Sequence, residues 1–260
     1  MYYGICDISC VPIRKETSHR SEQVSELLFG ESFEVLDEHK EWLKIICSYD
    51  DYEGWISNTV FTPCTGPEYR NDRKKMHACS YDILQPAISS KRQIPILIGS
   101  SLPNYDGMIV KLGKEKFSVN GRVTNPKKKY DATFLQKTAM QFLHAPYRWG
   151  GKTPFGIDCS GFTQMVYKIL NVRLKRDAWQ QANQGEFITF INEANIGDLA
   201  FFGNDEKVSH VGIIINDEQI IHASGKVKID RLDQNGIYNI EQKKYTHNLR
   251  FIKRIKNFNI

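Results

Sequence analysis

No stretch of this 260-residue sequence approaches the roughly 20 consecutive apolar residues that a membrane-spanning helix needs. The first residues also lack the basic segment and the apolar core of an export signal. We therefore expect a cytoplasmic protein; a periplasmic or secreted location is the alternative if a presequence was removed before residue 1. Low-complexity tracts are missing as well, and the hydrophobic fraction of 41% is that of an ordinary globular chain.

The sequence has little excess charge of either sign, since 35 basic and 30 acidic residues give a formal net charge of +5. Its two basic clusters, residues 127–129 and 253–256, do not interleave with aromatic side chains as a nucleic-acid-binding surface does. Both clusters are typical of solvated chain segments. We expect a monomer with a small-molecule ligand, and neither a nucleic acid nor a membrane as partner.

Paired cysteine spacings are absent too: the six cysteines form no CxxC motif, which argues against a structural zinc framework. In a reducing compartment, scattered cysteines are usually small buried hydrophobic residues. We expect this of five of them, namely Cys6, Cys10, Cys47, Cys64 and Cys79. Cys159 differs from the others because of the residues that surround it.

The first part of the chain contains short apolar segments separated by polar turns. Segments at residues 24–29, 33–36, 42–46 and 52–56 are spaced roughly 8–12 residues apart, which predicts a small all-β barrel. The motifs "LLFGE", "WLKI" and "YEGWI" occur there in order. Over residues 8–62 this layout resembles the bacterial SH3-like (SH3b) domains.

Three segments are expected: an SH3b-like barrel at 1–62, a second, divergent SH3b-like region with a linker at 63–128, and a further domain at 129–260. Residues 63–73 are predicted to be the linker because they combine proline, glycine and charge. Apolar segments at 94–99 and 116–123 predict strands of the divergent region.

Beyond residue 131 the apolar pattern becomes helical, and a helix is expected to end before Pro146. A second helix begins after Asp158, which is a good N-cap residue. Its apolar stripe comprises Phe162, Met165, Val166, Ile169 and Leu170. Strands are expected at residues 199–202, 211–215 and 220–223. A helix followed by an antiparallel sheet predicts the α+β class.

Cys159 is expected in the first turn of this second helix. Unpaired backbone N–H groups and the helix dipole favour an anion there, which predicts a lowered thiol pKa. The same N–H groups, including that of Cys159, are suited to stabilising a tetrahedral oxyanion. A buried cysteine with a packing role only is the alternative interpretation.

Two histidines lie on the strands that follow. Alternation places His210, Gly212 and Ile214 on one face of their strand, and the glycine leaves room for another element, such as the cysteine helix. His222 lies nearly symmetrically across the turn at residues 216–218, so the two imidazole rings are predicted to be neighbours. His222 would then orient His210 while His210 takes the thiol proton. A lone strand histidine more often has a packing role, but two that converge are hard to explain by packing.

Zinc bound by Cys159, His210 and His222 is a further alternative. No glutamate stands beside these residues as a metal-assisted base, and the cysteine already has the position of a nucleophile. We therefore expect no metal and no other cofactor.

Six motifs in the C-terminal half make the resemblance more specific. Their order and spacing resemble the NlpC/P60 cell-wall peptidases, which have a papain-like core: "PYRWGG" (146–151), "DCSGF" (158–162), "RDA" (176–178), "GDLAFF" (197–202), "SHVGI" (209–213) and "IHAS" (221–224). The resemblance implies Cys159 as nucleophile, His210 as base and His222 as the orienting third member. One departure is Ala178, followed by Trp179, where many relatives have a serine.

SH3b modules ahead of such a domain resemble the γ-D-glutamyl-L-diamino acid endopeptidases of the dipeptidyl-peptidase VI type. The resemblance implies a thiol peptidase for murein-peptide recycling, which cuts the γ-D-Glu–diamino acid bond of free peptides and requires a free N-terminal L-Ala. An ammonium group that leaves water needs a carboxylate partner. The predicted substrate contacts are Asp158, Tyr147, Ser160, Asp177, Glu22 and Tyr52.

Other functions stay open at this point. An exported peptidoglycan hydrolase with wall-binding SH3b modules is one, and a catalytically idle murein-peptide-binding protein is another. An acyltransferase or a CHAP-type amidase is a third, because papain-like cores serve several acyl transfers. The choice between meso-diaminopimelate and lysine, and the tolerance of amidated D-Glu, are not encoded in any motif.

Overall fold

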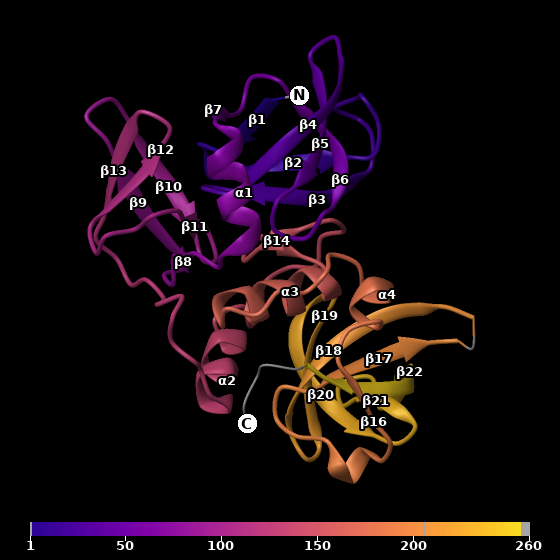
Figure 1. The fold of residues 1–260 in the computed structure, drawn as a ribbon. Coiled ribbons are helices and arrows are strands. Elements are labelled where there is room, and N and C mark those ends of the chain that lie inside the picture. The colour runs from indigo at the N-terminus through magenta and orange to yellow at the C-terminus, as the bar shows by residue number, and fades with distance from the viewer. Residues whose placement is uncertain (1, 205, 256–260) are drawn as a thin grey trace. The chain divides into compact units, whose positions relative to one another are not determined.

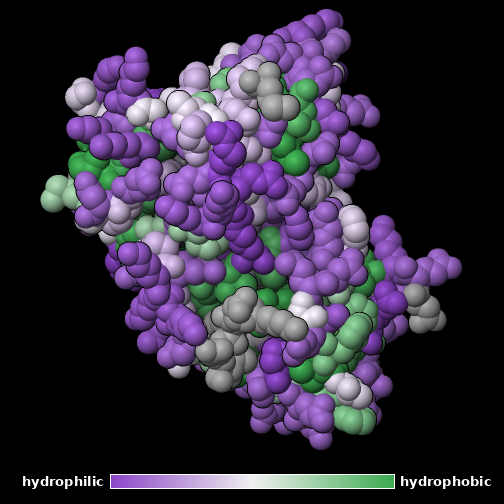
Figure 2. All heavy atoms as spheres, in the orientation of Figure 1, coloured by the Kyte–Doolittle hydropathy of each residue, from purple (hydrophilic) through white to green (hydrophobic). Residues whose placement is uncertain are grey.

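The computed structural model describes residues 2–204 and 206–255, and its chain forms two compact units, residues 1–128 and 129–260 (Figure 1). Within the described part of the chain, no helix has the length and apolar character needed to cross a membrane. On the face drawn in Figure 2, hydrophilic residues cover most of the surface.

Unit 1 begins with a seven-stranded antiparallel sheet in the order β3-β2-β6-β5-β4-β1-β7. Its strands are β1 (Tyr2–Ile5), β2 (Cys10–Arg14), β3 (Gln23–Leu28), β4 (Ser32–His39), β5 (Trp42–Cys47), β6 (Glu53–Ser57) and β7 (Thr62–Cys64). The four strands predicted from apolar spacing correspond to β3, β4, β5 and β6. Their inward residues, such as Leu27, Phe33 and Ile45, form one buried cluster.

Residues 63–73, predicted to be a linker, are mostly ordered as helix α1 (Gly66–Lys74). The linker prediction is wrong because Thr65 and Glu68 form a capping box: the Thr65 hydroxyl accepts from the Glu68 N–H, and the Glu68 carboxylate accepts from the Thr65 N–H. Pro67 stands in the first turn, where its missing N–H costs no intrahelical hydrogen bond. Proline and glycine here begin a helix instead of breaking one.

The rest of unit 1 is a second set of short strands. They are β8 (Ala78–Cys79), β9 (Leu84–Ile88), β10 (Gln93–Leu97), β11 (Ser101–Leu102), β12 (Ile109–Leu112) and β13 (Glu115–Val119). Four of them form a sheet in the order β10-β9-β13-β12, and β11 pairs with β8. The buried cluster of this region includes Ile5 of β1 and Phe29 of the turn after β3. The two parts of unit 1 are therefore packed against each other, and an SH3b-like origin of the second part stays a prediction.

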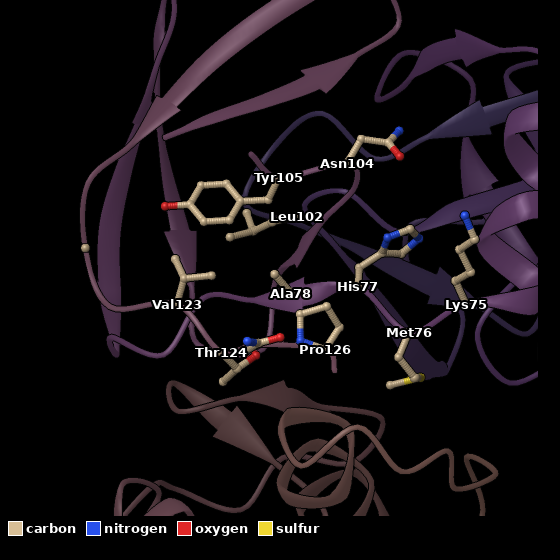
Figure 3. Close-up of a pocket in the computed structure, with 12 residues that line it drawn as sticks. Lys75, Met76, His77, Ala78, Leu102, Asn104, Tyr105, Val123, Thr124 and Pro126 are labelled. Carbon is tan, nitrogen blue, oxygen red and sulfur yellow. The ribbon is translucent and has the colours of Figure 1, made fainter. Parts of the chain in front are cut away.

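A pocket of about 520 Å³ lies within unit 1, beside β8 and β11 (Figure 3). His77, Asn104 and Tyr105 are among the residues that line it. The His77 ring is held by Asp72, whose Oδ1 lies 2.9 Å from Nε2. Neither Glu22 nor Tyr52 lines this pocket.

Unit 2 contains a closed sheet with helices outside it. Its strands follow the order β16-β22-β17-β18-β19-β20-β21, and an additional pairing of β21 with β22 closes a barrel. The elements are α2 (Ala132–Met140), β14 (Lys152–Thr153), β15 (Gly156–Ile157), α3 (Cys159–Ile169), α4 (Ala178–Gln181), β16 (Glu186–Ile188), η1 (Ile191–Glu193), β17 (Leu199–Gly203), β18 (Val208–Asn216), β19 (Gln219–Ser224), β20 (Lys226–Asp233), β21 (Gly236–Asn239) and β22 (Lys244–Arg254). The predicted α+β class is confirmed.

Helix α3 packs against strands β18 and β19 on the outside of this barrel (Figure 1). All five residues of its predicted apolar stripe are buried. Polar residues of the helix are buried as well, and each has a partner within the unit: the Thr163 hydroxyl donates to Oε1 of Gln181, and the Gln164 amide donates to the Leu174 carbonyl. The helix start is thereby held in a fixed place against the sheet.

The barrel interior is lined by alternate residues of its strands. Phe202, Ile214, Ile220 and Ile237, each from a different strand, belong to one buried cluster. His210 shares the face of Ile214 and so points to the same side of β18. Gly212 leaves room for another element, as predicted, but a side chain there would meet Ile220 and His222 of β19 and not the cysteine helix.

Candidate active site

The start of α3 is built around the buried carboxylate of Asp158. Its Oδ1 accepts from the Gly161 N–H at 2.7 Å, as expected of the N-cap residue. Its Oδ2 accepts from the Gly150 N–H at 2.8 Å and from Arg176 at 2.6 Å. The Ser160 hydroxyl also contacts Oδ1, at 3.3 Å. Asp158 therefore ties together the glycine-rich loop, the helix and a buried arginine.

The glycines of "RWGG" and "DCSG" are required by close backbone approach. A side chain at Gly161 would lie 2.3 Å from the Gly151 carbonyl oxygen. Gly150 has a φ of 73°, in the left-handed region that glycine adopts without strain. The loop can therefore pack directly on the first turn of the helix, next to Cys159.

Cys159 is 7% exposed and lies at the first position of α3. Burial raises the pKa of its thiol to about 12, and the charge of Asp158 adds to this effect. Hydrogen bonds from the backbone N–H groups of Val211 and Ser160, and the charge of Arg176, oppose it. The predicted lowering of this pKa is wrong, because burial outweighs the helix start. The resting sulfur is protonated at neutral pH.

The contact with Val211 also locates the sulfur relative to the sheet. Val211 follows His210 on β18, so the sulfur is held at the backbone beside the histidine. The packing of α3 on β18 thus places the sulfur of the nucleophile candidate at the backbone of the residue that follows the base candidate.

The two predicted histidines are in contact. Nε2 of His210 lies 2.9 Å from Nδ1 of His222, and both rings are buried. In the hairpin register, Gly212 pairs with His222, so the two histidines are diagonal neighbours on one face. Burial lowers the pKa of both rings, and for His210 the shift takes the pKa well below its usual value. Both imidazoles are therefore neutral at pH 7.

A third contact extends this chain to Asp230, which was not among the predicted site residues. Nε2 of His222 lies 3.1 Å from Oδ2 of Asp230. Lys228 and Asn239 contact the same oxygen at 3.2 and 3.1 Å. Burial raises the pKa of Asp230, but the hydrogen bonds from His222 and Lys228 outweigh it, and the net shift is downward. Asp230 is a buried, ionised carboxylate.

A third histidine, His247 on β22, stacks on the ring of His210. Their ring centroids are 4.2 Å apart with an interplanar angle of 26°. Burial lowers the pKa of His247 to about 4. Phe202 is a further neighbour, whose ring centroid lies 5.8 Å from that of His210 and 6.1 Å from that of His247. The base candidate is therefore in contact with two other rings that also contact each other.

The other predicted contacts in unit 2 have these places. Tyr147 is about one-third exposed, and its pKa is raised to about 12 by burial and by the nearby Cys159 and Asp158, so its hydroxyl is a proton donor. The Ser160 hydroxyl accepts from Arg176 at 3.0 Å. Asp177 precedes α4 as its N-cap residue, and its N–H donates to Gln180 at 3.0 Å. Their substrate roles stay predictions.

Glu22 and Tyr52 belong to unit 1. Glu22 is exposed and pairs with Lys15 at 3.2 Å. Tyr52 is partly buried against the core of the first sheet, and its N–H donates to Asp50 at 3.1 Å. Their predicted substrate contacts also stay predictions.

Asp230 could have been found by repeating the hairpin argument once. Ser224 pairs with Lys226 across the turn at Gly225, and His222 therefore pairs with Lys228. Asp230 is two residues further on the same face, diagonal to His222. His247 has no such signal, because its place depends on the closure of the barrel by β21 and β22.

A buried thiol at the backbone of Val211, the neutral imidazole of the preceding residue and a chain of polar groups behind that imidazole form an arrangement suited to nucleophilic catalysis. Across residues 2–204 and 206–255, no group of three His, Cys, Asp or Glu side chains has the geometry to hold a metal ion. A thiol nucleophile with a histidine base fits the geometry as it stands.

Comparison with known proteins gives matches over both units. A family model described as "NlpC/P60 family" matches residues 144–250, and one described as "Bacterial dipeptidyl-peptidase Sh3 domain" matches residues 13–59. A protein named dipeptidyl-peptidase 6 from Lysinibacillus sphaericus is 30% identical over 187 residues, covering 63% of this chain and 68% of the relative. A gamma-D-glutamyl-L-lysine dipeptidyl-peptidase of Bacillus subtilis (strain 168) is 27% identical over 182 residues, covering 62% of this chain and 58% of that relative.

Solved structures share the fold. A structure of an NlpC/P60 family protein from Bacillus cereus ATCC 10987 has a TM-score of 0.79 at 20% identity, covering 97% of this chain and 99% of the other. An NlpC/P60 endopeptidase from Photobacterium damselae subsp. piscicida has a TM-score of 0.67 at 16% identity, covering 96% and 70% of the two chains. These likenesses extend to the N-terminal strands as well as the C-terminal barrel.

Proposed function

This chain belongs to the NlpC/P60 family of cysteine peptidases, and from that premise we propose that it hydrolyses the γ-D-Glu–diamino acid bond of free murein peptides. Cys159 is the proposed nucleophile, His210 the base and His222 the residue that orients the base. The observation that carries the proposal is the 2.9 Å contact between the two imidazoles, beside a sulfur held at the N–H of Val211.

The proposed reaction starts from a neutral pair. Because the thiol pKa is raised and that of His210 is lowered, the proton moves from sulfur to His210 as the sulfur attacks the peptide carbonyl carbon. The carbonyl π electrons move to oxygen, and the backbone N–H of Cys159 and the Tyr147 hydroxyl are the proposed donors to this oxyanion. The oxyanion then collapses, the C–N bond breaks, and the proton on His210 passes to the leaving amine.

Deacylation reverses these roles with water in place of the thiol. His210 takes a proton from water, the hydroxide attacks the thioester carbon, and the C–S bond breaks as the proton returns to sulfur. Both steps need a base that is neutral before the reaction, which burial ensures for His210.

Relatives of the chain support the substrate class. The second relative's name specifies a γ-D-glutamyl-L-lysine bond. We extend this bond type to the present chain and propose a requirement for a free N-terminal L-Ala, with a role in recycling wall peptides in the cytoplasm. Asp158 is the proposed partner of the substrate ammonium in unit 2, with Tyr147 beside it.

The test is a pair of substrates that differ at the amine. L-Ala-γ-D-Glu-meso-diaminopimelate and its N-acetylated form are incubated with the protein, and the products are identified by mass spectrometry. We expect L-Ala-γ-D-Glu to be released from the free peptide, at least about 100-fold slower cleavage of the acetylated one, and no turnover by Cys159→Ala. Equal rates on both peptides would remove the free-amine requirement.

The lysine analogue of the free peptide reports which diamino acid is preferred. Intact sacculi test the alternative function. If the protein solubilises wall material as readily as it cleaves the free tripeptide, the result would favour an exported peptidoglycan hydrolase. If none of these substrates is cleaved but the tripeptide binds saturably in titration calorimetry, the result would favour a murein-peptide-binding protein.

A further inference from the structure

We propose that Asp230 is a positioning residue for the base: through His222 it fixes the tautomer of His210, so that Nδ1 of His210 takes the proton of Cys159. This inference rests on the proposed roles of Cys159 and His210. Asp230 becomes a fourth member of the group formed by Cys159, His210 and His222, and it lies on β20, outside the six sequence motifs.

The first step is the orientation of Asn239 on β21. Its side-chain oxygen accepts from the Gln242 backbone N–H at 2.7 Å. A backbone N–H can only donate, so the amide oxygen of Asn239 faces Gln242 and its NH2 group faces Asp230. The distances from that nitrogen to Oδ1 and Oδ2 of Asp230 are 3.3 and 3.1 Å.

The second step is the state of Asp230. Asn239 and Lys228 both approach it as donors, and a group surrounded by donors is stabilised as a carboxylate. An ionised carboxylate is an acceptor only. The contact of 3.1 Å from Oδ2 to Nε2 of His222 therefore requires the proton to be on Nε2.

The third step passes along the imidazoles. A neutral His222 with its proton on Nε2 has a lone pair on Nδ1, and this atom lies 2.9 Å from Nε2 of His210. Nε2 of His210 must therefore carry a proton and donate it to His222. The lone pair of His210 is left on Nδ1, the ring nitrogen nearer to the backbone.

The sulfur lies on that side. Cys159 accepts a hydrogen bond from the backbone N–H of Val211, the residue after His210. The ring nitrogen on the backbone side of His210 is thus the one presented to the thiol. When the proton arrives at Nδ1, the imidazolium still donates through Nε2 to His222, and His222 donates to Asp230, so no further proton needs to move.

The groups that face these imidazoles come from every neighbouring strand. Lys228 and Asp230 lie on β20, Asn239 on β21 and His247 on β22. The positive charge of Lys228 opposes protonation of His210 and His222, whereas Asp230 favours protonation of His222. His247 stays neutral above about pH 4. Asp230 is therefore the group whose charge supports the imidazolium of the reaction.

Two substitutions separate its acceptor role from its charge. Asp230→Ala removes the acceptor, so we expect His222 to lose its preference for a proton on Nε2 and kcat to fall about 100-fold. Asp230→Asn keeps an acceptor: His222, Lys228 and Asn239 all approach Oδ2 as donors, so the amide oxygen takes this place. We expect this variant to keep the wild-type tautomers and to lose no more than about tenfold in kcat.

Asp198→Ala is the matched control. Asp198 is a second buried carboxylate of the barrel, but it pairs with Arg254, at 2.7 Å. We expect the control to lose stability like Asp230→Ala while it keeps the wild-type kcat and tautomers. Imidazole ¹⁵N chemical shifts of His210 and His222 report the tautomers, and thermal unfolding by circular dichroism reports the folded fraction.

The tautomers are measured without substrate, so they test this inference even if the proposed peptide is not cleaved. Protons on Nε2 of both histidines in the wild type, lost in Asp230→Ala and kept in Asp230→Asn, would support it. Wild-type tautomers in Asp230→Ala, or a kcat within threefold of the wild type, would overturn it. Should the alanine variant not fold, Asp230→Asn decides through its pH profile. We expect the acid limb of kcat/KM to move to lower pH, and a profile that coincides with the wild type would refute the inference.

Discussion

Arg176→Met is expected to destabilise unit 2 strongly, because it leaves a buried carboxylate without its cation. Arg176 is 1% exposed, and its guanidinium donates to both oxygens of Asp158, at 3.0 and 2.6 Å. It also donates to the Ser160 hydroxyl at 3.0 Å. The methionine side chain can fill much of the same space, so the loss reports mainly the ion pair.

The magnitude follows from the burial of the pair. Breaking a buried ion pair by removing one partner costs about 3–5 kcal/mol. For a unit of about 130 residues, unfolding entropy near 2.1 cal/mol/K per residue converts this loss to a Tm decrease of roughly 11–18 °C. Two backbone N–H groups also donate to Asp158 and remain in the variant. They still stabilise the buried carboxylate in part, so we expect a loss at the lower end of this range.

The assay is thermal unfolding of the full chain, monitored by differential scanning calorimetry. Two further variants are compared with Arg176→Met. Asp158→Asn combined with Arg176→Met removes both charges and keeps an N-cap side chain, so we expect it to be more stable than Arg176→Met alone by at least about 1 kcal/mol. Arg122→Met is the exposed control: its pair with Asp82 is 62% and 26% exposed, and its loss should cost about 1 kcal/mol or less. A decrease below about 1 kcal/mol for Arg176→Met, or a double variant less stable than the single one, would refute the reasoning.

Four further predictions concern the site. Because burial holds the pKa of Cys159 at about 12, the rate of its alkylation by iodoacetamide should rise about tenfold per pH unit from pH 7 to 10. A rate that stays constant above pH 8 would contradict this. Because the pKa of His210 is lowered, its imidazole stays neutral below pH 6.5, and the acid limb of kcat/KM should have its midpoint below pH 6.5. A midpoint above pH 6.5 would be inconsistent with the effect of burial. His247→Phe keeps the stacked ring and should retain kcat within about threefold, whereas His247→Ala should lower it about tenfold, and equal losses would argue against stacking as the reason. Gly161→Ala places a side chain against the Gly151 carbonyl and should cost about 1–3 kcal/mol in chemical denaturation, where an unchanged midpoint would show that the loop can move away.

Local rules were sufficient for the parts of the site that depend on neighbours in the chain. An N-cap preference and a 3.6-residue period placed Asp158 before α3 and Cys159 in its first turn. Alternation across a short hairpin placed His210 and His222 on one face, and their rings are in contact. Both rules act within about a dozen residues, where backbone geometry leaves few alternatives.

Features that depend on distant strands or on opposing effects could not be obtained this way. His247 reaches the site because β22 pairs with both β17 and β21, and no local pattern specifies that closure. The thiol pKa of Cys159 depends on two opposing effects: burial raises it, and the position at a helix start lowers it. The position at the helix start can be predicted from the sequence, but the extent of burial cannot. Helix α1 shows the reverse case: the sequence contains its capping box, but the proline and glycine beside it led to the prediction of a linker.

The site therefore separates its charges from its reacting atoms. Asp158 is paired with Arg176 on the helix side, and Asp230 with Lys228 on the barrel side. Between these two pairs, the sulfur and the three imidazoles are neutral at pH 7, since burial opposes a charge on each. A neutral thiol is a poor target for oxidants and alkylating agents, so the proposed nucleophile is protected until a substrate carbonyl lies against it. In the proposed mechanism, the charge that forms on His210 is stabilised by groups already in place, which lowers the reorganisation needed in the reaction.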